Sequence, residues 1–308
     1  MIVNLNPHFK TVIALMFAFL IVFFAMKNID YSNVKDNFFD ISLPLLLMSL
    51  FVFIMVLIAQ SFRFKCLYPY AIKTIHIFII NLSSQSLNLV FPGQISGEVY
   101  KYSKLYKRSN SKLQTSFIII MDRLVGFLSA ILIALLSLIL FKPKFLAEVN
   151  IKYLSNMNFT WNYWLFVFFG GGVLVLFYKH IVKQQIEKYQ FKKWLVNVNW
   201  FNLIFFSVIS LFFRVLRFYL LAQALHLHFN FVDAIFLLAF CQLSAFIPSL
   251  AGNIGVLEGI IIFSLMLLGI QSPDALIFAL WNRISIVVIG LIGSLFLFYE
   301  TQTTKHPI

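Results

Sequence analysis

The stretch Phe91-Pro92-Gly93-Gln94-Ile95-Ser96-Gly97-Glu98 closes the apolar region 71–91. A second stretch, Pro248-Ser249-Leu250-Ala251-Gly252-Asn253-Ile254-Gly255-Val256-Leu257-Glu258, interrupts the apolar region 232–270. Proline and glycine break helices, and lipid cannot satisfy the backbone groups that a break frees. Broken helices at membrane depth occur where they are buried in protein or line a wet cavity. We therefore predict two broken or re-entrant hairpins, with hinges at Pro92, Gly93, Gly97, Gly252 and Gly255.

The composition outside these stretches is that of a membrane protein. Of the 308 residues, 61% are hydrophobic, 38 are Phe and only 11% are charged. Soluble proteins are about 45–50% apolar and about 25% charged, so both a soluble fold and a disordered chain are excluded. Six apolar runs approach the about 20 residues that cross a bilayer: 9–26, 41–62, 116–141, 161–178, 202–225 and 275–299. The predicted fold is an all-α polytopic membrane protein, one integral domain over 1–308, with about six full spans plus the two hairpins.

The basic residues predict the orientation. The formal net charge is +13, from 24 basic and 11 acidic residues. If the N-terminus is cytoplasmic and each hairpin returns to its own side, 15 basic residues lie inside and 5 outside. This asymmetry follows the positive-inside rule and predicts cytoplasmic termini in a bacterial-type inner membrane. The charge is then read as attraction to anionic headgroups, as in the basic run 101–112, and not to nucleic acid.

The two interrupted regions are similar in order and spacing. Glu98 precedes Arg123 by 25 residues, and Glu258 precedes Arg283 by the same interval. An Arg-Phe pair occurs on the helix before each break, at 63–64 and 217–218. The repeat units are approximately 41–141 and 202–299. Three full crossings separate their first helices, and an odd number gives inverted repeats, the architecture of many secondary transporters.

Ionisable residues within apolar helices are the candidate site residues, because each costs about 2.5–3.5 kcal/mol at the centre of a span. Glu258 could cap a half-helix N-terminus or pair with an arginine. Arg214 and Arg217 share a helix face and could bind phosphate, form an internal salt bridge to Glu98 or Glu258, or extend to a membrane interface. Asp122-Arg123 fits either a helix-start pair or a site. The predicted substrate-binding residues are Glu98, Lys101, Arg123, Arg214, Arg217, Glu258 and Arg283.

Several function classes lack their motifs. No G-x-x-x-x-G-K-[ST], G-x-S-x-G or H-E-x-x-H is present. No acidic or Cys partner completes a metal set with His226 and His228, and Cys66 and Cys241 form no metal spacing. The acidic residues are too sparse for an Asp-rich transferase site. We therefore predict no catalytic residue, no metal and no cofactor.

Three segments resemble the lysylphosphatidylglycerol synthase/flippase transmembrane family, which includes the membrane half of the multiple peptide resistance factor. Residues 91–101 resemble its first signature, a Pro, a Gly-Glu pair and a basic residue three positions later. Residues 121–124 resemble its acidic-Arg segment, and 252–258 its second glycine-rich signature. The departures are Lys101 for a common Arg, which would lose bidentate geometry, Ala251 for Pro and Asn253 for Gly. The resemblance runs from about 10 to 299.

The resemblance implies lipid translocation. In the resistance factor a separate cytosolic domain transfers the aminoacyl group, and this chain carries no such segment. The predicted function is flippase-like transport of a polar, anionic or phosphate-bearing lipid through a cavity between the repeats. Two alternatives stay open at this point: a membrane-embedded transferase acting on a lipid carrier, and a non-transporting partner of cell-envelope enzymes.

Overall fold

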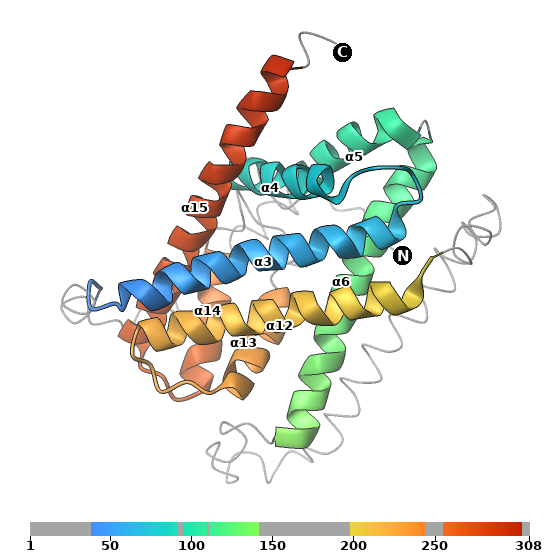
Figure 1. Ribbon diagram of the computed structural model, residues 1–308. Coiled ribbons are helices and arrows are strands. Elements are labelled where there is room, and N and C mark those ends of the chain that lie inside the picture. Colours follow the sequence, from blue (N-terminus) through green and yellow to red (C-terminus); the bar gives the residue numbers. More distant parts are fainter. Residues whose placement is uncertain (1–37, 91–94, 110, 142–197, 244–254, 304–308) are drawn as a thin grey trace, which may run out of the picture.

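The computed structural model describes residues 38–90, 95–109, 111–141, 198–243 and 255–303. Within these ranges the chain forms eight helices and no strand. Figure 1 shows their arrangement, and an all-helical chain is what the composition predicts. In chain order the helices are α3 (Leu43–Leu67), α4 (Thr74–Val90), α5 (Ile95–Ser109), α6 (Lys112–Phe141), α12 (Trp200–Ala224), α13 (Phe231–Leu243), α14 (Val256–Leu267) and α15 (Ser272–Thr303).

The interrupted regions form paired helices, as predicted. The first is α4 followed by α5, and the second is α13 followed by α14. Four predicted spans correspond to α3, α6, α12 and α15, each of which extends beyond the apolar run. By length and composition, α3, α12 and the Ser272–Leu297 part of α15 could each cross a membrane. The predicted spans 9–26 and 161–178 lie outside the described residues.

Helices α3 and α12 form a central antiparallel pair (Figure 1). The start of α3 meets the end of α12, where the Ser42 N–H donates to the Ala224 carbonyl at 2.8 Å. Near their other ends the rings of Phe62 and Phe206 stack with centroids 5.1 Å apart. The outer faces of the pair carry exposed Phe and Leu side chains, including Phe201, which is 77% exposed. Such an apolar surface suits contact with lipid.

The remaining helices pack around this pair in a reciprocal pattern. Helix α4 contacts α15, and α13 contacts α6. Helix α3 also contacts α4, as α12 contacts α13, and both hairpins then contact the long helix that follows them. If each helix of α3–α6 is swapped in chain order with its counterpart in α12–α15, every contact named here therefore becomes another contact of the same set.

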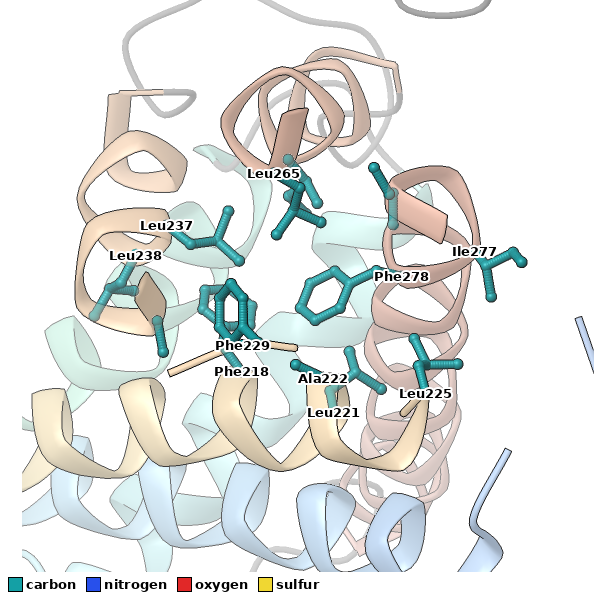
Figure 2. Close-up of a cluster of buried hydrophobic side chains, with 14 of the residues drawn as sticks. Phe218, Leu221, Ala222, Leu225, Phe229, Leu237, Leu238, Leu265, Ile277 and Phe278 are labelled. Carbon is teal, nitrogen blue, oxygen red and sulfur yellow. The ribbon is translucent and has the colours of Figure 1, made fainter. Parts of the chain in front are cut away.

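The largest apolar cluster joins α12 to the second hairpin and α15 (Figure 2). Phe218, Phe229 and Phe278 meet at its centre, with ring centroids 6.1–6.3 Å apart for the pairs that share Phe278. Leu221, Leu237 and other fully buried aliphatic side chains surround these rings. Burial of this cluster holds α13 and α14 against α12 and α15, and so fixes the second hairpin beside the polar interior.

Candidate substrate cavity

Two adjoining cavities lie among the described helices. Each has a volume of about 280 Å³. Each volume is close to the lower end of the range of about 300–1,000 Å³ that is typical of small-molecule sites. The residues that line both are mostly carboxamides, with one arginine: Gln60, Gln85, Asn88, Arg214 and Gln242. These side chains come from α3, α4, α12 and α13, so the cavities connect the two halves of the chain.

Positive charge predominates in these cavities. Four cations line the first cavity, Arg63, Lys101, Arg123 and Arg214, and its acids are Glu98 and Asp122. The second cavity adds Arg217, and no carboxylate of a described residue lines it. Five cations therefore face two carboxylates. An excess of three positive charges in an apolar setting favours an anionic ligand.

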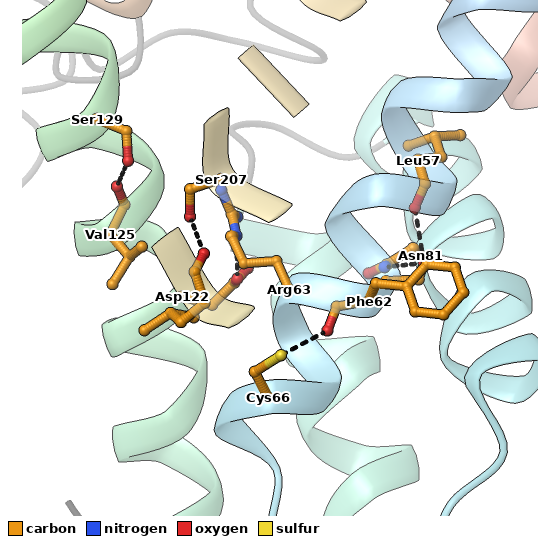
Figure 3. Close-up of polar contacts among 11 residues, drawn as sticks. Leu57, Phe62, Arg63, Cys66, Asn81, Asp122, Val125, Ser129 and Ser207 are labelled. Carbon is orange, nitrogen blue, oxygen red and sulfur yellow. Dashed lines mark hydrogen bonds and ion pairs between the residues drawn. The ribbon is translucent and has the colours of Figure 1, made fainter. Parts of the chain in front are cut away.

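The first unit holds its charges in two ion pairs. Arg63 of α3 donates from Nε to Asp122 Oδ1 of α6 at 2.8 Å (Figure 3). Arg123, the next residue on α6, contacts Glu98 of α5 at 2.5 Å. Gly126 makes room for the first pair, because a Cβ at this position would lie 2.8 Å from a guanidinium nitrogen of Arg63. Two helices, α3 and α5, therefore converge on adjacent residues of α6.

The second unit has a matching ion pair outside these two cavities. Arg283 of α15 contacts Glu258 of α14 at 2.5 Å. Glu258 also accepts a hydrogen bond at 2.7 Å from the backbone N–H of Gly255, the N-cap of α14. The two roles open in the sequence, cap and ion pair, are thus combined in one side chain. Neither Glu258 nor Arg283 lines either cavity; the neighbouring Leu257 lines the second.

Arg217 has a different environment. It is 8% exposed, and its terminal nitrogen donates to Asn282 Oδ1 of α15 at 2.5 Å. Its guanidinium lies over the Phe53 ring, 4.0 Å from the centroid, a cation–π distance. Its Nε–H is buried, with no hydrogen-bond partner among the described residues. Arg217 thus enters the second cavity with spare donor capacity.

The structure brings most of the predicted site residues together. Glu98, Lys101, Arg123, Arg214 and Arg217 line the cavities, and Gly97 packs closely against α4. Gly255 has a φ of 85°, a left-handed backbone that favours glycine. The predicted hinge residues Pro92, Gly93 and Gly252 lie outside the described residues.

Three sequence interpretations need correction. The count of 15 inner basic residues treats Arg63 as part of a loop, but it lies inside α3 and is 5% exposed. The basic asymmetry persists without it. Asp122-Arg123 does not start a helix, because α6 begins ten residues earlier at Lys112. The suggested internal salt bridges of Arg214 and Arg217 to Glu98 or Glu258 are also not formed, since those carboxylates pair with Arg123 and Arg283.

Sequence reasoning missed the polar amides of the cavity. Gln60, Gln85, Asn88 and Gln242 are uncharged residues within apolar helices, and charge was the only criterion applied. Asp122 was considered together with Arg123 but was left out of the predicted substrate-binding residues, and Arg63 was left out because it follows the predicted span 41–62. The repeated Arg-Phe pair at 63–64 and 217–218 was the available signal for Arg63, because its second member was already placed within a span. Among the described residues, no group of three His, Cys, Asp or Glu side chains could hold a metal ion.

Comparison with known proteins identifies the family. No curated protein matches the sequence. A protein-family model, described as the lysylphosphatidylglycerol synthase TM region, matches residues 11–293. The match begins before α3 and ends within α15, so it includes both hairpins and both cavities. This multi-pass membrane chain therefore belongs to the lysylphosphatidylglycerol synthase transmembrane-region family.

Proposed function

We propose that this chain is a flippase-like transporter that moves a polar, anionic, phosphate-bearing lipid between membrane leaflets. The observation that carries the proposal is the excess of three positive charges in the two adjoining cavities. The family match supports a lipid-related role for the membrane region. A protein that only scaffolds other enzymes would have no use for uncompensated cations in its interior, where each is costly.

The cavity chemistry suits a phosphate headgroup. Arginine guanidinium groups bind phosphate oxygens through paired, charge-assisted hydrogen bonds. Arg214 lines both cavities and therefore lies where a headgroup would pass from one to the other. The carboxamides beside it can donate to phosphate and accept from headgroup hydroxyls. The acyl chains would stay against the apolar outer faces of α3 and α12 while the headgroup occupies the interior.

The proposed transport path lies between two inverted repeats, units 41–141 and 202–299 of a single domain. The antiparallel α3–α12 pair and the reciprocal contacts of α4 with α15 and of α13 with α6 support this interpretation. The ion pairs Glu98–Arg123 and Glu258–Arg283 add side-chain support, because each joins the second hairpin helix to the long helix after it. Alternating access would then arise from rocking of one repeat against the other.

The test is lipid translocation in vesicles that contain the purified protein. Fluorescent phosphatidic acid, phosphatidylglycerol and phosphatidylcholine are placed in both leaflets, and an impermeant quencher reports the fraction that reaches the outer leaflet. We expect faster movement of the two anionic lipids. Arg214→Gln should slow them at least about ten-fold, because a charged hydrogen bond contributes about 1.5–3 kcal/mol and about 1.4 kcal/mol is ten-fold.

The control is Phe201→Leu, which changes an exposed side chain on the same helix and should transport at the wild-type rate. Equal rates for phosphatidylcholine and the anionic lipids, or a wild-type rate in Arg214→Gln, would contradict the proposal. Analysis of the lipids after incubation addresses the transferase alternative, because a transporter returns its lipid chemically unchanged.

A further inference from the structure

The two halves of the chain differ at one pair of equivalent positions. Asp122 and Asn282 are 160 residues apart, as are Glu98 and Glu258, and Arg123 and Arg283. Each precedes the arginine that pairs with the glutamate of its hairpin. Each also accepts from a buried arginine of the first helix of its unit, Asp122 from Arg63 and Asn282 from Arg217. The first acceptor is a carboxylate and the second is a neutral amide.

The exchange of Asp for Asn leaves Arg217 without a counter-charge. In the first unit the arginine Nε donates to the carboxylate at 2.8 Å. In the second unit the arginine Nε is buried and has no partner among the described residues. A buried donor that stays unsatisfied costs roughly 1–3 kcal/mol, and more when the group is charged. A bound anion would supply both the missing hydrogen bond and the missing charge.

Arg214 is a second arginine of α12 without a counter-charge among the described residues. It lies one helical turn before Arg217 on α12, and the two arginines line the same cavity. The described residues place no carboxylate within 4.0 Å of either side chain, since their ion pairs join other cations. The second cavity therefore holds two positive charges with no negative charge from its described lining, and two negative charges on a ligand would neutralise them.

We infer that the second cavity, through Arg214 and through Arg217 with its neutral partner Asn282, selects headgroups with two negative charges on phosphate, a phosphomonoester or a diphosphate. The inference rests on the proposed function and specifies its substrate class. The inferred substrate class differs from the aminoacylated lipid after which the family is named. Lysylphosphatidylglycerol carries two ammonium groups and one phosphate, a net charge of about +1, which the two arginines would repel.

Asn282→Asp is the decisive variant. The change is nearly isosteric and gives Arg217 the carboxylate that Arg63 already has. An internal ion pair should then replace the bound anion. Asn202→Asp is the matched control, because it makes the same chemical change near the start of α12, about four helical turns before Arg217.

The experiment measures equilibrium binding of phosphatidic acid, phosphatidylglycerol and lysylphosphatidylglycerol to the purified full chain, by native mass spectrometry. We expect wild type and Asn202→Asp to bind phosphatidic acid at least about ten-fold more tightly than phosphatidylglycerol, and lysylphosphatidylglycerol most weakly. Asn282→Asp should lose at least about ten-fold in affinity for phosphatidic acid. Thermal unfolding of the three proteins without lipid verifies that Asn282→Asp is folded.

Two results would overturn the inference: equal or tighter binding of lysylphosphatidylglycerol by wild type, or wild-type affinity for phosphatidic acid in Asn282→Asp.

Competition with glycerol 3-phosphate shows whether the ligand of this cavity is a lipid or a soluble phosphate. Failure of a hundred-fold excess to displace phosphatidic acid supports a lipid ligand, and displacement at equal concentration assigns the site to soluble phosphate and contradicts the lipid class. Selective binding without translocation would refute the proposed function and leave the subsite intact.

Discussion

Glu258 joins two elements through its two carboxylate oxygens. One oxygen accepts from the Gly255 N–H and satisfies a free donor at the start of α14. The other accepts from Arg283 of α15. Both side chains of the ion pair are about one-sixth exposed, at 15% and 16%. The pair therefore lies largely in an apolar setting, where loss of one partner is costly.

Substitutions at Glu258 should separate these two roles. Glu258→Gln keeps an oxygen for the cap and removes the charge, and breaking a buried ion pair from one side costs roughly 3–5 kcal/mol. Glu258→Ala removes the cap as well, which costs about 0.5–2 kcal/mol more. Thermal unfolding in detergent should therefore rank Tm as wild type above Glu258→Gln above Glu258→Ala.

A double-mutant cycle tests the assigned partner. Arg283→Gln combined with Glu258→Gln should lose less stability than the two single changes added together, because the second change removes a charge that the first left uncompensated. Strict additivity of the two losses would show that Glu258 and Arg283 do not interact.

At the residue scale, the sequence singled out the charged residues within apolar helices but left their partners open. The equal 25-residue spacings of Glu98 to Arg123 and of Glu258 to Arg283 predicted a repeat, and the structure shows that each is also an ion pair. Spacing along one chain cannot show which helix faces which. The contacts of Arg63 with Asp122 and of Arg217 with Asn282 each join helices about 60 residues apart, and they were not predicted.

At the scale of elements, α4 and α15 pack through small residues. Ser86 of α4 donates to the Gly290 carbonyl of α15 at 2.5 Å. A Cβ on Gly293 would lie 2.2 Å from the Leu82 carbonyl oxygen, which is backbone and cannot rotate away. Small residues that allow such approach are a principal means of helix association in membranes. This contact holds the first hairpin against the last helix, so it fixes one wall of the cavities.

Gly293→Ala should force α4 and α15 apart. Overpacking of this kind costs roughly 1–3 kcal/mol, so Tm should fall measurably in detergent. The control is Leu295→Ala on the same helix, where the side chain is 68% exposed and its loss should leave Tm nearly unchanged. An unchanged Tm in Gly293→Ala, or equal losses in both variants, would show that this close contact does not support the fold.

The breaks were predictable as elements, and their packing was not. The stretches rich in Pro and Gly that end in Glu98 and Glu258 predicted two hairpins, and each is a pair of helices. Helix α5 starts two residues before Gly97, and α14 starts directly after Gly255. Periodicity gave no sign that α4 packs on α15 across the units. That contact depends on close approach at Gly290 and Gly293, and nothing in the sequence marks these two glycines as sites of contact between helices.

At the scale of the whole molecule, the reciprocal contacts make a prediction about sidedness. If the units are inverted repeats, equivalent loops lie on opposite faces of the membrane. The loop between α3 and α4 includes Tyr70, and the equivalent loop between α12 and α13 includes His228. The basic asymmetry further predicts that the first of these loops is cytoplasmic, together with both termini.

Single cysteines at Tyr70 and His228 test this arrangement. Among the described residues, neither Cys66 nor Cys241 forms a disulfide, and both are first replaced by Ser. In intact cells an impermeant maleimide should label a cysteine at 228 and should not label one at 70. After lysis the cysteine at 70 should also be labelled. A reporter fused at Ile308 should be cytoplasmic, and one inserted near Asn150 external. Labelling of both cysteines from the same side would refute the inverted repeat, because a parallel repeat is the only arrangement of these equivalent loops that gives equal sidedness. External Ile308 with opposite labelling would preserve the repeat and reverse only the orientation that the basic residues predict.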